Sequence, residues 1–291
     1  LVEGYEGIVT VLKPPGMTSN NAVYDVRRLF GVKRVGHLGT LDPGAAGVLP
    51  VCVGRAARLF DYLVDKEKTY IAEIAFGIAT DTQDSYGKVT ETDPNCRVTR
   101  EMLEDVLPKF VGRQKQTAPA YSALKVDGRK MYDLARAGEA VPEKIREITI
   151  HGLRLMEQMG DNRYLIEVRC SRGTYIRTLA FDIGAALGVP AYLAFLLRTA
   201  SGSFTLDTAY SVQELEQRRE NGTLSETLMS CEEALKAYPA VSLPENRRIP
   251  TMNALESVCR APDGIVRVYA NGFLGLGEVR DNRVRLTVHL Y

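Results

Sequence analysis

Asp42 lies in a glycine-rich loop whose composition suggests a catalytic or ligand-binding site. Residues 36–47 contain four glycines, which let a backbone turn sharply and approach a ligand closely. Asp-Pro-Gly at 42–44 is also a common surface turn. The residues around Asp42 are too apolar for an exposed turn, and they are Leu38, Leu41, Ala45, Ala46, Val48 and Leu49. We therefore expect the loop to pack against a core and to present a single carboxylate.

A second segment, residues 170–177, offers the cation that such a carboxylate needs. A carboxylate that loses its hydration favours its protonated form unless a positive charge stands near it. The segment joins an expected strand to an expected helix and places Tyr175 and Arg177 in the first helical turn. Arg177 can pair with a carboxylate through two parallel hydrogen bonds. The other interpretation is an arginine on a solvated helix face, and sequence spacing does not decide whether Arg177 meets Asp42.

The motifs that the sequence lacks narrow the chemistry further. A glycosidase needs two carboxylates that flank the scissile bond, and residues 36–47 contain one. The sequence has no Gly-x-Ser-x-Gly, no phosphate-binding Gly-x-x-x-x-Gly-Lys and no His-Glu-x-x-His. Its three histidines and five scattered cysteines lack metal-ligand spacing, and the cysteines are typical of reduced thiols in a cytosolic protein. We expect no metal and no cofactor, with covalent or electrostatic catalysis by Asp42 alone.

Basic and aromatic residues gather near both segments. The formal net charge is only +1, so the overall charge does not indicate a nucleic-acid partner. The local clusters are Arg27, Arg28, Lys33 and Arg34; Lys125, Arg129, Lys130 and Arg136; and Arg163, Arg169, Arg172 and Arg177, interleaved with Tyr70, Tyr121, Tyr132 and Tyr175. Such mixtures bind RNA through phosphate contacts and base stacking, although charged runs are also found on solvated faces.

Hydrophobic periodicity predicts the elements that must position these residues. The composition, 45% hydrophobic and 25% charged, is that of a soluble globular protein, and no apolar run reaches the ~18–20 residues of a membrane span. A helix is expected at 19–30, capped by Ser19 and ended by Gly31. The other expected elements are strands at 69–76 and 163–170, helices at 99–110 (kinked or ended by Pro108) and 174–187, and two short helices opened by capping boxes at Ser211 and Ser230.

The chain changes character after Tyr238. Prolines at 239, 244 and 250 punctuate it, and short strands are expected at 265–269, 273–279 and 284–290. These last ~50 residues predict a small all-β module. Before that point strands and helices alternate without a regular βαβ pattern, which predicts an α+β domain with a mixed sheet.

Several sequence motifs follow one another along the chain, and their order is that of a known family whose resemblance covers almost the whole chain. They are Lys-Pro-Pro-Gly-Met-Thr-Ser at 13–19, the glycine loop at 36–49, Lys-Thr-Tyr at 68–70, Thr-Asp-Thr-Gln-Asp-Ser-Tyr-Gly at 80–87, Pro-Ala-Tyr-Ser-Ala-Leu-Lys at 119–125 and Gly-Thr-Tyr-Ile-Arg at 173–177. Together they resemble the motifs of the bacterial tRNA pseudouridine(55) synthases of the TruB type.

This resemblance implies roles for individual residues. Asp42 would be the catalytic nucleophile, Arg177 would pair with it, and Tyr70 would stack on the target uracil. Residues that would bind the substrate are His37, Tyr175 and Leu196, which line the nucleotide pocket, together with Lys13, Asp84 and Arg58. Arg58 stands where the family often has lysine and keeps the charge for a phosphate contact, and Leu197-Arg198 replaces a frequent Arg-Arg pair.

The resemblance also implies the fold and the reaction. The fold would be α+β, with a pseudouridine-synthase-like mixed, largely antiparallel sheet flanked by helices, and a C-terminal PUA-like module. The catalytic domain would span 1–240, with an RNA-gripping insertion at about 118–141, and the PUA-like module would span 241–291. The enzyme would isomerise uridine 55 in the T-loop of tRNA by flipping the base, without a cofactor. It would act as a cytoplasmic monomer with no membrane and no obligate protein partner.

Two alternatives belong to other functional classes. A non-catalytic RNA-binding or RNA-folding protein of this fold is expected to lack Asp42 or Arg177, and both are present. A synthase that depends on a guide RNA, or acts on another RNA, is expected to have a longer C-terminal module and protein partners. The short segment after Tyr238 favours the stand-alone enzyme. Whether Asp42 attacks C1′, attacks C6 or removes the C2′ proton stays open.

Overall fold

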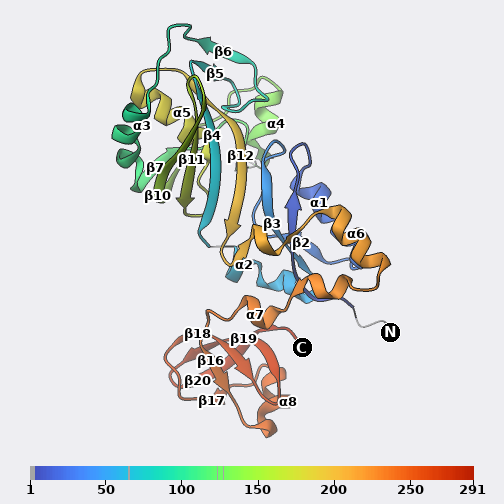
Figure 1. The fold of residues 1–291 in the computed structure, drawn as a ribbon. Helices are drawn as coiled ribbons and strands as arrows, with labels where there is room; N and C mark the ends of the chain where they lie inside the picture. Colours follow the sequence, from blue (N-terminus) through green and yellow to red (C-terminus); the bar gives the residue numbers. More distant parts are fainter. Residues whose placement is uncertain (1–3, 65, 123, 127) are drawn as a thin grey trace.

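The fold is built on one large mixed sheet. In the part of the chain that the computed structural model describes, residues 4–64, 66–122, 124–126 and 128–291, this sheet has 11 strands. They are β1 (Gly7–Lys13), β2 (Val35–His37), β3 (Ala46–Val53), β4 (Lys68–Phe76), β7 (Gly112–Thr117), β10 (Ile145–Gly160), β11 (Arg163–Cys170), β12 (Ala191–Ser201), β13 (Phe204–Thr205), β14 (Ala209–Tyr210) and β15 (Leu228–Met229). The main path runs β14-β1-β3-β12-β4-β11-β10-β7 (Figure 1).

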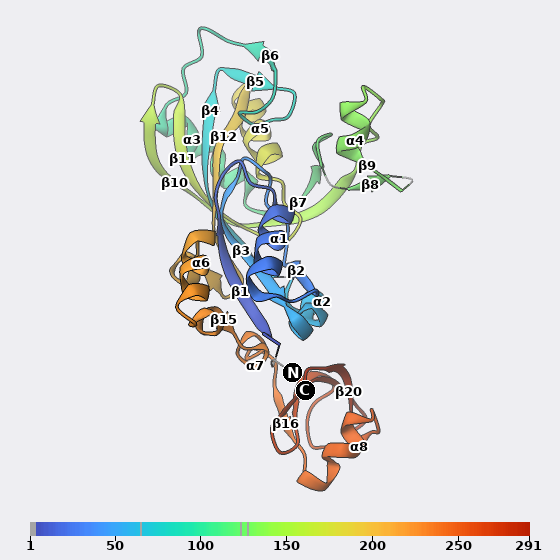
Figure 2. The ribbon, with the colours of Figure 1, turned by 90° about the vertical axis from the view of Figure 1, so that its right-hand side faces the viewer.

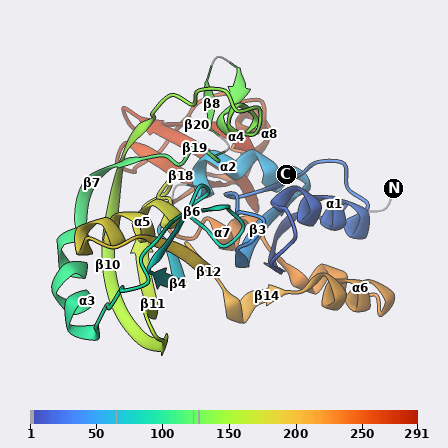
Figure 3. The ribbon, with the colours of Figure 1, turned by 90° about the horizontal axis from the view of Figure 1, so that it is seen from above.

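Helices pack against the two halves of this sheet. α5 (Ile176–Leu187) packs on β4 and β12, and α3 (Arg100–Val106) packs on α5 and β10, as the view from above shows (Figure 3). α1 (Ser19–Phe30) and α6 (Val212–Glu220) pack together beside β1. The shorter elements are α2 (Phe60–Leu63), α4 (Met131–Arg136), α7 (Cys231–Ala234), the 3-10 helices η1 (Gly54–Leu59), η2 (Leu107–Phe110), η3 (Leu206–Thr208) and η4 (Leu224–Thr227), and the hairpins β5 (Ile78–Thr80) with β6 (Val89–Thr92) and β8 (Lys125–Val126) with β9 (Arg129–Lys130).

β12 joins the two halves of the sheet beside the glycine loop. It pairs in parallel with β3, where Arg198 stands opposite Gly47, and antiparallel with β4, where Arg198 stands opposite Tyr70. Gly47 has φ 112°, and a Cβ there would lie 2.2 Å from the carbonyl oxygen of Arg198. This close approach requires glycine and holds the end of the loop against β12.

The helix before the glycine loop has its predicted bounds, Ser19–Phe30, but a different N-cap. Thr18, not Ser19, is the N-cap of α1, because Thr18 and Asn21 form a reciprocal capping box. Ser19 instead exchanges hydrogen bonds with the loop: its hydroxyl donates to Leu41 O at 3.0 Å and accepts from Leu41 N at 2.9 Å. Gly31 ends the helix in the left-handed conformation, as predicted.

The other expected elements are confirmed with small changes. The strand at 163–170 has its predicted bounds, and β4 begins one residue before the predicted strand. α3 ends at Val106, and the turn that contains Pro108 continues as η2. α5 begins at Ile176, so Tyr175 is its N-cap and lies before the first turn, contrary to prediction. Ser211 forms the full capping box, whereas Ser230 only accepts from the backbone N–H of Glu233.

The C-terminal segment forms a second sheet that packs on the first part of the chain (Figure 2). Its order is β16 (Ala240–Ser242), β18 (Gly264–Tyr269), β19 (Phe273–Arg280), β20 (Arg283–His289) and β17 (Ser257–Val258). The predicted β module is confirmed, and it also contains two short helical elements, η5 (Glu245–Arg247) and α8 (Arg248–Met252), between β16 and β17. Pro250 does not break α8 because it stands in the first turn, where backbone N–H groups have no partner within the helix.

Among the described residues, no helix is long and apolar enough to span a membrane. In the same part of the chain, no group of three or more histidine, cysteine, aspartate or glutamate side chains is arranged to hold a metal ion. The five cysteines are buried free thiols.

Candidate active site

Asp42 stands on the loop between β2 and β3, and its backbone is held from two sides. Ser19 fixes Leu41, as described above, and the backbone N–H of Gly16 donates to Pro43 O at 2.8 Å. The apolar residues predicted to bury this loop are themselves buried. The carboxylate of Asp42, however, is 43% exposed. The loop is therefore part of the core, while the Asp42 side chain faces an open pocket.

Arg177, in the first turn of α5, contacts Asp42. Its Nε lies 2.9 Å from Oδ2 of Asp42, while Nη1 and Nη2 donate to the carbonyl oxygens of Thr82 and Tyr121, both at 3.0 Å. The Nε–H vector does not satisfy hydrogen-bond geometry toward the carboxylate, so the contact is an ion pair by distance only. The expected bidentate pairing is absent between these two described residues, because backbone carbonyls take the two terminal nitrogens. Arg177 itself is only 5% exposed on its side chain, so those carbonyls hold it in place.

A pocket beside this ion pair, which we call the Asp42 pocket, collects most of the predicted site residues. Its walls include His37, Asp42, Tyr70, Tyr175, Arg177 and Leu196. Tyr70 comes from β4, His37 from β2, Leu196 from β12 and Tyr175 from the N-cap of α5. The sheet order brings these four separate segments together, with an ion pair at the wall and aromatic and apolar side chains around it. A flat ring that is polar at its edges fits such a pocket.

The aromatic and imidazole side chains of the Asp42 pocket favour their neutral forms. Burial raises the pKa of the Tyr70 hydroxyl, so the phenol stays protonated. Burial, and secondly the positive charge of Arg198, lowers the pKa of His37. The Nδ1 atom of His37 is buried and has no hydrogen-bond partner among the described residues. Neutral rings in the wall of a pocket suit stacking more than they suit proton transfer.

Arg198 is a residue of the site whose role sequence reasoning missed. Its side chain is almost completely buried, with 1% of the residue exposed. Nε donates to Val48 O at 2.7 Å, Nη2 to Gly39 O at 3.1 Å and Nη1 to Thr40 O at 3.4 Å. Arg198 thus ties both ends of the Asp42 loop to β12. An arginine inside an apolar alternating strand was the available signal, because such a buried cation needs several acceptors.

Lys13 holds the same loop from the other side and does not line the Asp42 pocket. It is completely buried, at 0% exposed, and its Nζ donates to the carbonyl oxygens of Pro14 at 2.9 Å, Met17 at 2.6 Å and Pro43 at 3.3 Å. Burial lowers its pKa to about 8, and the negative charge of Asp42 acts in the opposite direction. Its position is that of a residue that orients the loop.

Asp84 lies on the far side of the Asp42–Arg177 ion pair. Its Oδ1 atom accepts hydrogen bonds from the Thr82 hydroxyl at 2.6 Å and from the Tyr86 N–H at 3.0 Å. Its Oδ2 atom lies 3.9 Å from Arg177 Nε. Asp84 lines a separate hollow with Asp42 and Arg177, which we call the Asp84 hollow. Asp84 therefore adjoins Asp42 without lining the Asp42 pocket.

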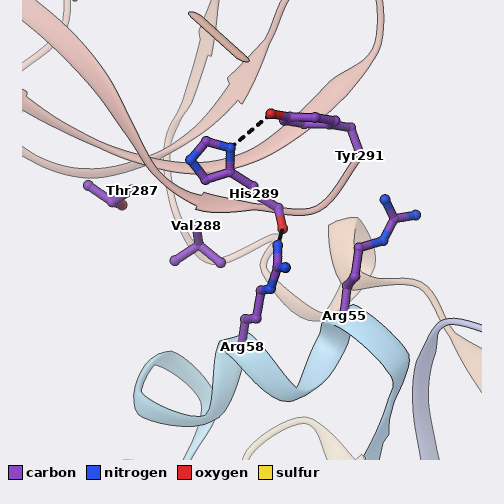
Figure 4. Close-up of a pocket in the computed structure, with 6 residues that line it drawn as sticks. All are labelled: Arg55, Arg58, Thr287, Val288, His289 and Tyr291. Carbon is purple, nitrogen blue, oxygen red and sulfur yellow. Dashed lines mark hydrogen bonds between the residues drawn. The ribbon is translucent and has the colours of Figure 1, made fainter. Parts of the chain in front are cut away.

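Arg58 is the predicted site residue that lies away from Asp42. It stands on η1 and donates from Nη1 to the carbonyl oxygen of His289 at 2.6 Å, at the junction with the C-terminal sheet (Figure 4). The hollow there is lined by Arg55, Arg58, Thr287, Val288, His289 and Tyr291. It is a basic opening with hydroxyl donors, and nothing in its position connects it to the Asp42 pocket.

The expected insertion contains the β8–β9 hairpin and α4, which project from the end of β7 (Figure 2). Residues 123 and 127 of this stretch lie outside the described residues. Ser122 and Leu124 line the Asp42 pocket, and Tyr121 holds Arg177 through its carbonyl. Arg129, predicted as part of a basic cluster, pairs with both carboxylate oxygens of Glu139 at 2.8 Å. The insertion therefore closes one side of the pocket.

Solved structures with a similar chain path define the class of the fold. "Structure of H/ACA RNP bound to a substrate RNA containing 2'-deoxyuridine" matches with a TM-score of 0.74 at 21% identity and covers 98% of this chain and 85% of that one. "Crystal Structure of a Cbf5-Nop10-Gar1 Complex" matches with a TM-score of 0.73 at 23% identity, over 98% and 84% of the two chains. The protein thus shares the fold of these two chains, and the predicted α+β fold with a PUA-like module is confirmed.

Sequence relatives narrow the class to one family. The TruB family pseudouridylate synthase N-terminal domain matches residues 27–176, and the tRNA pseudouridylate synthase B C-terminal domain matches residues 177–236. The tRNA pseudouridine synthase B of Caldanaerobacter subterraneus is 38% identical over 96% of this chain and 97% of its own length. That of Bacillus licheniformis is 46% identical over 81% of this chain and 78% of its own. The chain belongs to the TruB family and is a pseudouridine synthase, an isomerase.

Proposed function

We propose that this protein converts uridine 55 in the T-loop of tRNA to pseudouridine, with Asp42 as its single catalytic carboxylate and without a cofactor. The observation that carries the proposal is the half-exposed Asp42 carboxylate 2.9 Å from Arg177 in a pocket walled by Tyr70 and Leu196. The names of the relatives, tRNA pseudouridine synthase B, support tRNA as the substrate.

The reaction breaks the N1–C1′ bond of uridine and forms a C5–C1′ bond. C5 loses its proton and N1 gains one, so no electrons are transferred and no co-reactant is consumed. The target base must leave the loop stack, which costs a few kcal/mol. Tyr70 replaces the lost stacking with its neutral ring, and Leu196 and His37 keep the detached base from leaving. Asp42 then acts at C1′ or C6, or removes the C2′ proton.

Arg177 matters most once the substrate is bound. The Asp42 carboxylate is 43% exposed in the free protein, so water solvates it there. A base that fills the pocket displaces this water, and the protonated carboxylate then becomes more favourable unless a cation compensates. Arg177 is held in place by Thr82 and Tyr121 and supplies this charge. Asp84 holds the loop of Thr82, while Lys13 orients the loop of Asp42.

The rest of the RNA contacts surfaces outside the Asp42 pocket. We assign residues 1–240 to the catalytic domain and 241–291 to the PUA-like module, with the insertion at about 118–141 gripping the T-stem-loop. Arg58, with Arg55, offers a phosphate site at the junction of the two parts. The protein would work as a monomer in the cytoplasm, without an obligate protein partner.

The test is tritium release from a minimal T-stem-loop labelled at C5 of uridine, because release reports the isomerisation directly. We expect the purified protein to release tritium with no added guide RNA, metal or protein, and Asp42→Asn to release none. Release only with a guide RNA would indicate the guide-dependent alternative. RNA binding without any tritium release would indicate an RNA-binding protein without this activity. If a chelator abolished the activity and a metal ion restored it, the cofactor-free reaction would be contradicted.

A further inference from the structure

An aromatic side chain stands exposed on the rim of the Asp84 hollow. Tyr86 is 67% exposed, and it lines this hollow together with Asp42, Arg177, Leu196 and Phe195. A tyrosine so exposed contributes little to the core, and its hydroxyl is not needed to hold the loop, since the described hydrogen bonds there involve other groups. Its location beside the reactive carboxylate therefore calls for a functional reason.

The loop that carries Tyr86 is rigidly built. Asp84 accepts from the Thr82 hydroxyl and the Tyr86 N–H, and the Thr80 hydroxyl donates to Asp84 O at 2.7 Å. The N–H of Lys88 donates to Asp81 Oδ1 at 2.8 Å. Such a network holds the backbone of Tyr86 before any ligand arrives, so little conformational entropy would be lost when its ring binds a ligand.

The ring of Tyr86 rests directly on the catalytic loop. A Cβ added at Gly44, two residues after Asp42, would lie 2.2 Å from a ring carbon of Tyr86. Glycine at 44 therefore makes room for the ring. The ring is fixed against the segment that holds the nucleophile, and a large part of it remains open to solvent.

Phe195 supplies a second exposed ring on the same hollow. The pairing of β12 with β4 shifts register between Leu193 and Phe195. Phe195 is 39% exposed, whereas Leu193 and Leu196 on either side are buried. This bulge turns one aromatic side chain of an otherwise buried strand segment toward the opening.

We propose that Tyr86 and Phe195 form a stacking platform for the unpaired base next to the target uridine, an inference that rests on the proposed function. The Asp42 pocket and the Asp84 hollow share Asp42, Arg177 and Leu196 as walls. A nucleotide bound in the Asp42 pocket therefore places the adjacent nucleotide of the RNA strand at the Asp84 hollow. Exposed aromatic rings stack bases of any sequence, because every base has a π face. The pair would orient the RNA loop around the flipped target.

The test is a double-mutant cycle between Tyr86 and the RNA. The RNA is a T-stem-loop with an abasic site on the 5′ side or the 3′ side of the target, and Kd is measured by fluorescence anisotropy. We expect Tyr86→Ala and Tyr86→Leu to weaken binding of the intact RNA about tenfold, which equals about 1.4 kcal/mol. Tyr86→Phe keeps the ring and should bind within about twofold of wild type. One of the two abasic RNAs should bind wild type and Tyr86→Ala equally.

The control is Tyr24→Ala, since Tyr24 is 62% exposed on α1 and lines neither the Asp42 pocket nor the Asp84 hollow; it should leave Kd unchanged. Unaltered binding by Tyr86→Ala, or an equal loss on intact and both abasic RNAs, would overturn the stacking role. Weak binding by Tyr86→Phe would assign the effect to the hydroxyl and also overturn it. The anisotropy measurement needs no turnover. A wild type that releases no tritium from the intact RNA would refute the proposed function while the cycle still reports on stacking.

Discussion

Replacement of Arg177 by methionine separates its structural role from its electrostatic one. Arg177 makes four polar contacts: ion pairs with Asp42 and, at 3.9 Å, with Asp84, and hydrogen bonds to the carbonyl oxygens of Thr82 and Tyr121. Each carbonyl left without a donor costs about 1–3 kcal/mol. The ion pair with Asp42 involves a carboxylate that is 43% exposed, so solvent screening limits its contribution in the free protein to about 0–1 kcal/mol. We therefore expect Arg177→Met to lower the free energy of unfolding by about 2–7 kcal/mol, mostly through the two carbonyls.

The catalytic effect of the same change should depend on pH. When the target base displaces water from Asp42, loss of the Arg177 charge favours the protonated carboxylate. The ionised fraction then increases only at higher pH, so the residual rate of Arg177→Met should rise with pH where the wild-type rate is already flat. Arg177→Lys keeps the charge but cannot serve both carbonyls and the carboxylate with its compact ammonium group, and should recover part of the rate.

The assay is single-turnover tritium release at saturating RNA across pH, with urea unfolding of each variant as the stability control. A pH profile of Arg177→Met that parallels the wild type at a lower rate would refute the electrostatic role and leave Arg177 as a support for the loops of Thr82 and Tyr121. Unfolding stability equal to that of the wild type would refute the assignment of the carbonyl contacts.

Three further predictions concern other residues of the site. Asp42→Asn should abolish turnover and keep Kd for the T-stem-loop within about tenfold, and measurable multiple turnover would contradict its role. Lys13 has a pKa of about 8 against a usual 10.5, so between these pH values the unfolded chain binds more protons than the folded protein. The free energy of unfolding of the wild type, relative to that of Lys13→Met, should therefore rise with pH in this range by at most about 1.4 kcal/mol per pH unit. A difference between the two proteins that does not change with pH in urea unfolding would refute this. Arg58→Gln should weaken RNA binding and reduce the slope of log K against log salt by about 0.7–0.9, and an unchanged slope would argue against a phosphate contact.

The sequence predicted elements best where local patterns and burial agree. β11 alternates along its whole length, and the structure buries the predicted face, so its bounds were correct. α8 was missed because Pro250 is normally read as a breaker, and only its position in the first turn makes it compatible with a helix. Ser19 was expected to cap α1, but Thr18 and Asn21 form a capping box, which leaves the Ser19 hydroxyl for Leu41.

The geometry of the site could not be predicted from the sequence, because it is set by contacts between residues far apart in the chain. Asp42 and Arg177 meet because β12 pairs with both β3 and β4, which sets the loop beside the start of α5. The resemblance suggested the pair, but the position of Arg177 between two carbonyls and the exposure of Asp42 required coordinates. Arg198 was visible only as a departure from a frequent motif, since its three acceptors come from a loop about 150 residues earlier in the chain.

Two buried cations, Lys13 and Arg198, lie beside the loop that carries Asp42. Lys13 and Arg198 both donate to backbone carbonyl oxygens, in and around the Asp42 loop. Carbonyl dipoles satisfy their hydrogen-bonding groups without neutralising their charge, whereas a carboxylate partner would cancel it. Their positive charge therefore remains available to Asp42, as the opposing effect of Asp42 on the pKa of Lys13 indicates. The loop that turns through glycines and buries its apolar residues thus places Asp42 in a positive field, and under the proposed function this field would stabilise negative charge in the site when the RNA excludes water.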